Sequence, residues 1–268
     1  MQASRGYKNS LVTLRGRDRI GIINAITANA DAIAERDPKE FAQLQKDIEV
    51  VSLDRLIESF RRHLRRNSVE GAWQRLLELN PFLLSMLFGQ PVVIIRPSAS
   101  VGGQTIAGNG TKIADFLAAN SITHNAALVE IKRPNTPLLG SEYRGGVYPA
   151  SRDLLGSVTQ VLDQRLKLLT SIAQTRYTSK INDLDVSAVE CVVVAGQTPV
   201  GEELVASFEL FRSQLKDVRI VTFDELLEKL KILRELLTGE RYVSNIEDDE
   251  SDWWDVVGSD LEEDDSCG

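Results

Sequence analysis

Residues 126–134, AALVEIKRP, form a short apolar run that contains an acid and a base, Glu130 and Lys132. The run is typical of a buried β-strand, in which residues two apart point to the same face. Glu130 and Lys132 therefore share a face with Leu128, and the intervening residues point to the other face. The pair is either an ordinary ion pair or part of a chemical site.

The pattern around this strand predicts a mixed α/β domain in which helices pack on a sheet. From residue 68 the expected order is helix, three strands, helix, strand, helix, strand, helix. Strands are expected at residues 91–97, 111–120, 125–134, 187–196 and 217–223, and helices at 69–88, 152–174, 201–216 and 224–237. A glycine-rich stretch at residues 98–110 predicts a turn or hairpin tip.

The composition is that of a soluble globular protein, with 43% hydrophobic and 26% charged residues in a chain of 268. No apolar run approaches the roughly 18–20 residues that span a bilayer, and the N-terminus lacks the apolar core of a secretion signal. The only cysteines are Cys191 and Cys267, which favours a reducing cytoplasm. With two cysteines and two histidines, a metal would have to be held by carboxylates, which favours magnesium, manganese or calcium.

Charge divides the chain into parts. Residues 1–67 are charge-rich and mostly helical in pattern, residues 68–241 form the predicted domain, and residues 242–268 form an acidic tail predicted to be disordered. Eleven acidic residues and no basic residue follow Arg241, so the net charge of −8 becomes about +3 without them. Such a body is compatible with nucleic-acid binding. The tail could mimic DNA, bind a partner, or simply keep the protein soluble.

The acid-x-Lys pattern alone is weak, because Asp37-Pro38-Lys39 also matches it. Asp115, in the preceding predicted strand, strengthens it, because pairing of the two strands would bring Asp115 close to Glu130 and Lys132. Two neighbouring carboxylates repel each other, and a divalent cation relieves that repulsion. A lysine beside the cation suits an anionic substrate, which is the logic of metal-assisted phosphodiester hydrolysis.

The run from Asp115 to Glu130-Ile131-Lys132 resembles the PD-(D/E)xK phosphodiesterases, and the wider match resembles the Shedu anti-phage defence nucleases within that superfamily. The similarity covers roughly residues 68–237 in the expected order. Its stretches are EGAWQRLLELNPFLL, ADFLAAN, ALVEIKRPNTPLL, YRGGVYPASRDLLGSVTQVLDQR and IVTFDELLEKL.

The resemblance implies a restriction-endonuclease-like core with a mixed central sheet, and a magnesium-dependent endodeoxyribonuclease, with Mn²⁺ as a substitute, that nicks or cuts double-stranded DNA in defence against phage. It implies that Asp115 and Glu130 bind the metal, that Lys132 is the catalytic lysine and that Glu70 is an auxiliary metal ligand. Gln160 would lie near the scissile phosphate. A solvated glutamate explains Glu70 equally well, and a plain polar helix face explains the stripe of Ser157, Gln160, Gln164 and Lys167.

The partners follow from the same resemblance. Four residues around the motif are predicted to bind the DNA backbone, although loop arginines are often merely solvated: Arg133, Arg144, Tyr148 and Arg152. We also expect a cytoplasmic homo-oligomer, a tetramer by the resemblance, and a core containing Trp73 and Phe82. Two alternatives stay open: a catalytically idle nucleic-acid-binding or scaffolding module on the same fold, and a protein-interaction module in which Glu130 and Lys132 are a structural pair.

Overall fold

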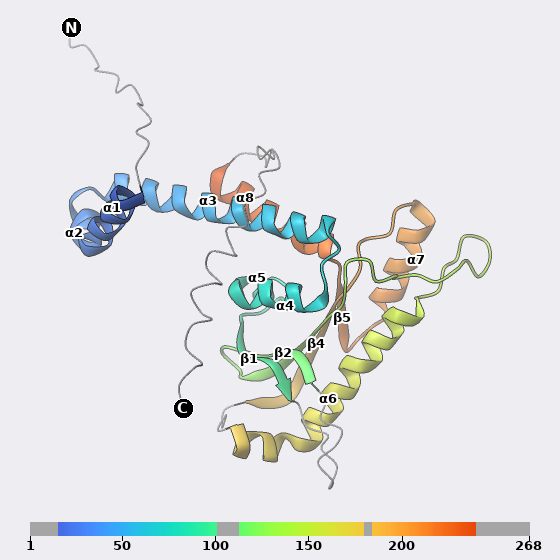
Figure 1. Cartoon of the computed structure of the whole chain (residues 1–268). Coiled ribbons are helices and arrows are strands. Elements are labelled where there is room, and N and C mark those ends of the chain that lie inside the picture. Colours follow the sequence, from blue (N-terminus) through green and yellow to red (C-terminus); the bar gives the residue numbers. More distant parts are fainter. Residues whose placement is uncertain (1–15, 101–112, 180–183, 240–268) are drawn as a thin grey trace, which may run out of the picture.

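The computed structural model describes residues 16–100, 113–179 and 184–239 (Figure 1). It confirms the mixed α/β architecture and the predicted order of elements. The predicted hairpin tip lies mostly outside the described residues, except that residues 98–100 belong to the first strand, and the acidic tail also lies outside them.

The five strands form one mixed sheet in the order β1-β2-β3-β4-β5. They are β1 (Val92–Ser100), β2 (Ile113–Asn120), β3 (Asn125–Ile131), β4 (Asp185–Val194) and β5 (Val218–Val221). The first three are antiparallel neighbours, and β3, β4 and β5 run parallel. The strand that carries Glu130 is therefore the middle strand, with an antiparallel neighbour on one side and a parallel neighbour on the other.

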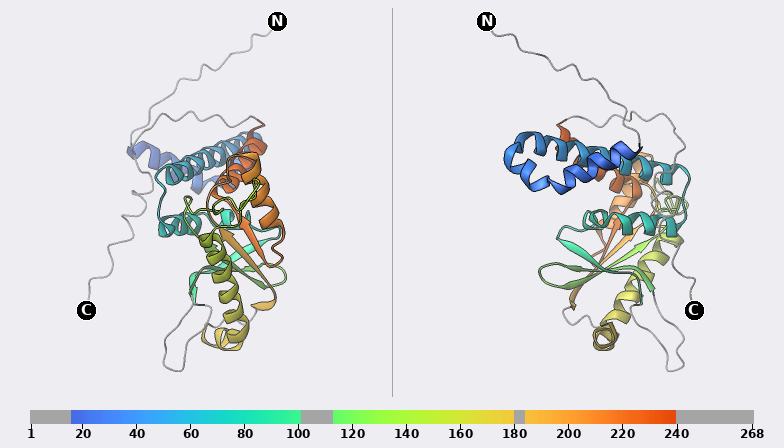
Figure 2. Two further views of the ribbon diagram at one scale, coloured as in Figure 1. Left: turned by 90° about the vertical axis from the view of Figure 1, so that its right-hand side faces the viewer. Right: turned by 60° about the vertical axis from the view of Figure 1, so that its left-hand side comes forward.

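Helices cover both faces of the sheet (Figure 2). One face is covered by the C-terminal half of α3 (Pro38–Arg65), by α4 (Glu70–Leu79) and α5 (Pro81–Ser85), and by α8 (Phe223–Thr238). The other is covered by α6 (Arg152–Ser179) and α7 (Glu202–Ser213). The alternation of β3 follows these layers, because Val129 and Ile131 join the first core and Leu128 joins the second.

An aromatic cluster holds α3, α4 and α8 together. Trp73 is fully buried, with ring centroids 4.7 Å from Phe60 and 4.4 Å from Phe223, distances at which aromatic pairs add to the stability gained by burial. The placement of Trp73 in the core is confirmed. That of Phe82 is wrong: α4 ends at Leu79, the chain starts a new helix at Pro81, and Phe82 is left 41% exposed.

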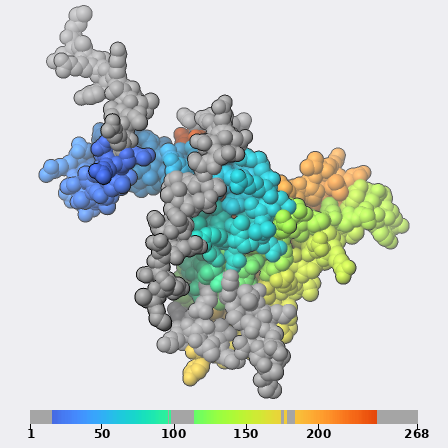
Figure 3. All heavy atoms as spheres, in the orientation of Figure 1, coloured from blue at the N-terminus to red at the C-terminus, as the bar shows by residue number. Residues whose placement is uncertain are grey.

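The N-terminal helices α1 (Gly16–Ala28) and α2 (Ala30–Arg36) contribute no buried residue. Together with the first half of α3 they project from the body of the molecule (Figures 1 and 3). In the described part of the chain, no helix is both long and apolar enough to cross a membrane.

Candidate active site

Glu130 lies at the centre of the candidate site, near the C-terminal end of β3 and facing α6. Its side chain is 3% exposed, so its carboxylate depends on hydrogen bonds from the protein. Oε1 accepts from Lys132 Nζ at 2.7 Å and from Gln160 Nε2 at 2.5 Å, and Oε2 accepts from Gln164 Nε2 at 2.8 Å. Both oxygens of this carboxylate are thus occupied by donors.

Lys132 is the first residue after β3, and its backbone N–H still donates to Val194 O of β4 at 2.8 Å. This extra bond continues the strand pairing by one residue and keeps Lys132 on the same face as Glu130. Its Nζ also donates to Gln160 Oε1 at 3.2 Å. Burial alone would lower the pKa of Lys132, but the hydrogen bond and charge of Glu130, with the charges of Glu70 and Asp115, raise the pKa overall. Lys132 is therefore an ammonium ion at neutral pH.

Asp115 reaches the site from β2. The two strands pair with Phe116 opposite Val129, and one residue further the Asp115 Oδ2 accepts the backbone N–H of Ile131 at 2.6 Å. Burial and the charge of Glu130 raise the pKa of Asp115 to about 6, against the lowering effects of the Ile131 hydrogen bond and Lys132. The predicted convergence of Asp115, Glu130 and Lys132 is thus present in the structure.

Glu70 begins α4, on the opposite side of the sheet from α6, and its side chain is exposed. Its charge raises the pKa of both Asp115 and Lys132, so it lies within electrostatic range of the site. One turn later, Gln74 Nε2 donates to the backbone carbonyl of Asp115 at 3.3 Å and ties α4 to β2. Residues 16–100, 113–179 and 184–239 contain no group of three or more His, Cys, Asp or Glu side chains that could together hold a metal ion.

The two glutamines of α6 differ in burial. Gln160 is exposed, whereas Gln164, one turn further, is 1% exposed. The helical stripe predicted from the sequence contains both, but a repeat of polar residues does not tell a solvated side chain from a buried one. The contact of Gln164 with Glu130 therefore could not be predicted from the polar stripe alone.

Residues 67–227 match the family described as "Shedu protein SduA, C-terminal". The chain belongs to the Shedu family. It is also 38% identical to a "Shedu protein SduA" of Bacillus cereus (strain B4264) over 222 residues, which cover 79% of this chain and 58% of that protein. The resemblance predicted from the sequence is confirmed, and the chain spans little more than half the length of this Shedu relative.

The matched Shedu region contains every candidate residue described above, from Glu70 to Gln164, and leaves α1 and α2 outside. It also contains the four residues predicted to bind DNA. The hydrogen bonds described for these residues are not with Asp115, Glu130 or Lys132. Arg133 Nη2 donates to Asn67 O at 2.8 Å. Tyr148 is half-buried, and its backbone N–H donates to Ser207 Oγ at 3.1 Å. The side chains of Arg144 and Arg152 are exposed.

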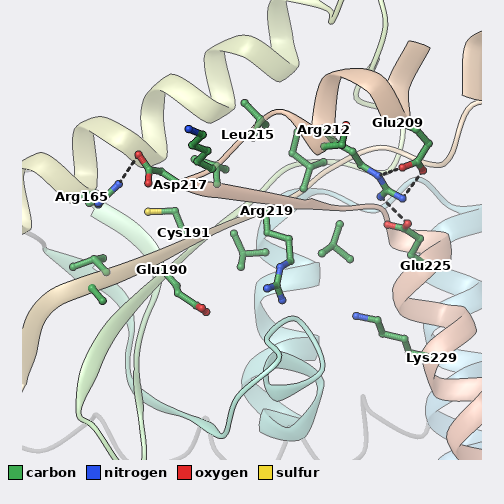
Figure 4. Close-up of a pocket in the computed structure, with 18 of the residues that line it drawn as sticks. Arg165, Glu190, Cys191, Glu209, Arg212, Leu215, Asp217, Arg219, Glu225 and Lys229 are labelled. Atoms are coloured by element: carbon green, nitrogen blue, oxygen red, sulfur yellow. Dashed lines mark hydrogen bonds and ion pairs between the residues drawn. The ribbon is translucent and has the colours of Figure 1, made fainter. Parts of the chain in front are cut away.

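A separate cavity of this Shedu chain has a lining that does not include Glu130. It is a groove of about 1010 Å³ between β4, β5, α7 and α8 (Figure 4). Several of its charged side chains form ion pairs: Arg212 contacts Glu209 at 2.5 Å and Glu225 at 2.7 Å, and Arg165 contacts Asp217 at 3.3 Å. Burial raises the pKa of its Cys191 thiol to about 12, so that thiol is not reactive at neutral pH.

Proposed function

We propose that this chain is a metal-dependent DNA endonuclease with a PD-(D/E)xK core that acts in bacterial defence against phage. The observation that supports this most directly is the meeting of Asp115, Glu130 and Lys132 at one end of the middle strand. Membership of the Shedu family supports the defence role.

The donor chemistry of the site fits magnesium. Asp115 and Glu130 offer carboxylate oxygens, the donors that Mg²⁺ prefers, and Mg²⁺ commonly binds one or two protein carboxylates while keeping several waters. Burial, and then the charge of Glu130, raises the pKa of Asp115 despite Lys132, so added positive charge would favour the ionised pair. A bound Mg²⁺ would supply that charge, polarise the phosphate and lower the pKa of a bound water. Glu70 adds negative charge to the site but forms no three-carboxylate group with Asp115 and Glu130 in the described part of the chain, so its role as an auxiliary ligand stays a prediction.

The protein's own groups would bind and orient the DNA phosphate. Lys132 is held as an ammonium ion whose side chain is 20% exposed, so it can contact a phosphate and stabilise developing negative charge. Gln160, exposed beside it, is placed to donate a hydrogen bond to the same phosphate. The exposed Arg144 and Arg152 are the best candidates for contacts with the flanking backbone, because Arg133 donates to Asn67 O.

Assembly into a homo-oligomer, a tetramer by family resemblance, belongs to the same proposal. Its structural support is the projecting N-terminal region, which exposes a set of large apolar side chains: Ile20, Ile22, Ile23, Leu44, Ile48 and Val51. Exposed apolar side chains that gather into a patch often mark interfaces between subunits. Light scattering on the full chain and on a variant with Ile20, Ile23 and Ile48 replaced by Ser tests this assembly.

Incubation of the purified chain with supercoiled and linear DNA, in magnesium and in chelator, tests the central proposal. We expect nicking or cutting in magnesium, none in chelator, and none by Glu130→Gln in either condition. DNA binding without cleavage in any divalent metal would instead support the idle binding module on the same fold. Neither binding nor cleavage would favour the protein-interaction module.

A further inference from the structure

Glu130 has two oxygens in different surroundings. Oε1 faces the open side of the site, where its donors are Lys132, with a side chain 20% exposed, and the exposed Gln160. Oε2 faces the interior, where its described donor is Gln164 at 2.8 Å. The carboxylate is therefore held on its interior side by a buried amide and on its open side by two more exposed groups.

The burial of Gln164 needs a reason, because glutamine is seldom fully buried and loses much rotamer freedom there. Its neighbours along the buried face of α6, Val161 and Leu168, are completely buried apolar residues. A leucine at position 164 would continue that face without burying an amide. The described contact that distinguishes the glutamine is its hydrogen bond to an ionised carboxylate, which is stronger than a bond between neutral groups.

We propose that Gln164 is a positioning residue for Glu130. Its hydrogen bond holds Oε2 in place. Oε1 is then the oxygen that can release its hydrogen bond from Lys132 or Gln160 and bind a divalent cation. Gln160 can leave Oε1 by turning into solvent, whereas Gln164 cannot leave Oε2 without rearranging the packed interior between α6 and the sheet. This inference rests on the proposed metal-dependent function.

The test measures Mn²⁺ binding to the full chain without DNA, by electron paramagnetic resonance of free Mn²⁺. Gln164→Met keeps an unbranched side chain of similar length but removes the amide. Hydrogen-bonding partners of metal ligands typically contribute about 10- to 100-fold in metal affinity, and we expect Gln164→Met to weaken Mn²⁺ binding by that amount. The Mg²⁺ concentration for half-maximal cleavage should rise in parallel, while DNA affinity in chelator stays the same.

Ser157→Ala is the matched control. Ser157 is also buried on α6, at 3% exposure, but its hydroxyl donates to Asp153 O within its own helix rather than to Glu130. This control should leave both metal measurements unchanged. A purely structural role for Gln164 would lower the melting temperature without moving the Mn²⁺ affinity of the folded protein.

The outcomes separate this inference from the proposed function. If the wild-type chain neither binds Mn²⁺ nor cleaves DNA, both fail. If it does both and Gln164→Met binds Mn²⁺ as tightly as wild type, only the inference is overturned. Gln164→Leu serves as a second variant, and loss of cooperative melting in both variants would assign Gln164 to fold stability and overturn its positioning role.

Discussion

The end of β3 and the groove beside β5 each place two carboxylates around one cation, but in different surroundings. In the groove, Arg212 is shared by Glu209 and Glu225. Burial would lower the pKa of Arg212, but the hydrogen bonds and charges of the two glutamates raise it overall. At the end of β3, two carboxylates share one lysine, and the pKa of Asp115 rises to about 6. The two glutamates of the groove are 48% and 31% exposed, whereas Glu130 is 3% exposed. The buried carboxylates and the pKa raised by burial, which are typical of functional sites, are therefore at β3.

Among the variants that test this comparison, we expect Lys132→Met to lose the most DNA cleavage. Removal of one group that stabilises a transition-state charge typically costs about 100- to 1,000-fold in rate, and we expect a loss at the upper end because Lys132 also neutralises Glu130. Single-turnover cleavage of plasmid DNA measures it, with DNA affinity in chelator retained.

Lys167→Met is the matched control for Lys132→Met. Lys167 lies on the same side of the sheet, on α6, and is 38% exposed, with Nζ 3.9 Å from Asp163. The Lys167→Met variant should cleave DNA at the wild-type rate. Normal cleavage by Lys132→Met would remove Lys132 from the proposed mechanism.

Asp115→Asn should separate activity from stability. Loss of a hydrogen-bonding partner of a metal ligand typically costs about 10- to 100-fold, and we expect a fall in cleavage at the upper end because Asp115 would itself bind the metal. A folded pKa of about 6 against the usual 3.8 means that the ionised carboxylate opposes folding, so stability is lost as pH rises from 3.8 through 6. In chelator at pH 8, Asp115→Asn should therefore unfold at a higher denaturant concentration than wild type, since the amide oxygen can still accept from Ile131. We expect its free energy of unfolding to be about 2 kcal/mol higher, after allowance for partial exposure.

The pH dependence provides the control for Asp115→Asn. The stability gain should disappear near pH 4, where Asp115 is largely protonated in the folded chain. Added Mg²⁺ should stabilise the wild type and not the variant, because a ligand stabilises the form that binds it. A variant less stable than wild type at pH 8 would show that the carboxylate is not strained in the folded protein.

Gln160→Met is expected to have a smaller effect and to differ in kind from Gln164→Met. A hydrogen bond to a charged group contributes about 1.5–3 kcal/mol, so loss of the bond proposed between the Gln160 amide and the DNA phosphate should slow cleavage by about 10- to 100-fold at saturating metal. Because Gln160 occupies the exchangeable Oε1, Mn²⁺ should bind this variant at least as tightly as wild type. Weaker Mn²⁺ binding would mean that both oxygens of Glu130 need their amide donors.

Local patterns predicted most of the fold. The alternation in β3 separated Val129 and Ile131 from Glu130, and the short connection to β2 made pairing of Asp115 with that strand the natural expectation. Features set by distant contacts were not visible in the sequence. The burial of Gln164 depends on the packing of α6 against the sheet, and the contact of Arg133 with Asn67 O joins segments 66 residues apart.

The smallest effect on cleavage is expected for Arg212→Gln, in the groove. Arg212 is 22% exposed, and its partners Glu209 and Glu225 are 48% and 31% exposed, so solvent screens both ion pairs. Glu225 also completes the N-terminal cap of α8, where its backbone N–H donates to Thr222 Oγ1 and its carboxylate accepts from the Thr222 N–H. The cap persists without Arg212, so we expect a loss of about 1 kcal/mol in the free energy of unfolding.

Cleavage by Arg212→Gln should stay within about twofold of wild type, because a stability loss of this size leaves the chain folded. Denaturant unfolding and plasmid cleavage on the same preparation measure the two quantities. A tenfold loss of cleavage with unchanged unfolding would contradict the division between the two regions, because it would show that the groove takes part in DNA cleavage. Unchanged cleavage would show that the Arg212 ion pairs of the groove are not needed for cleavage, in agreement with a site at the end of β3.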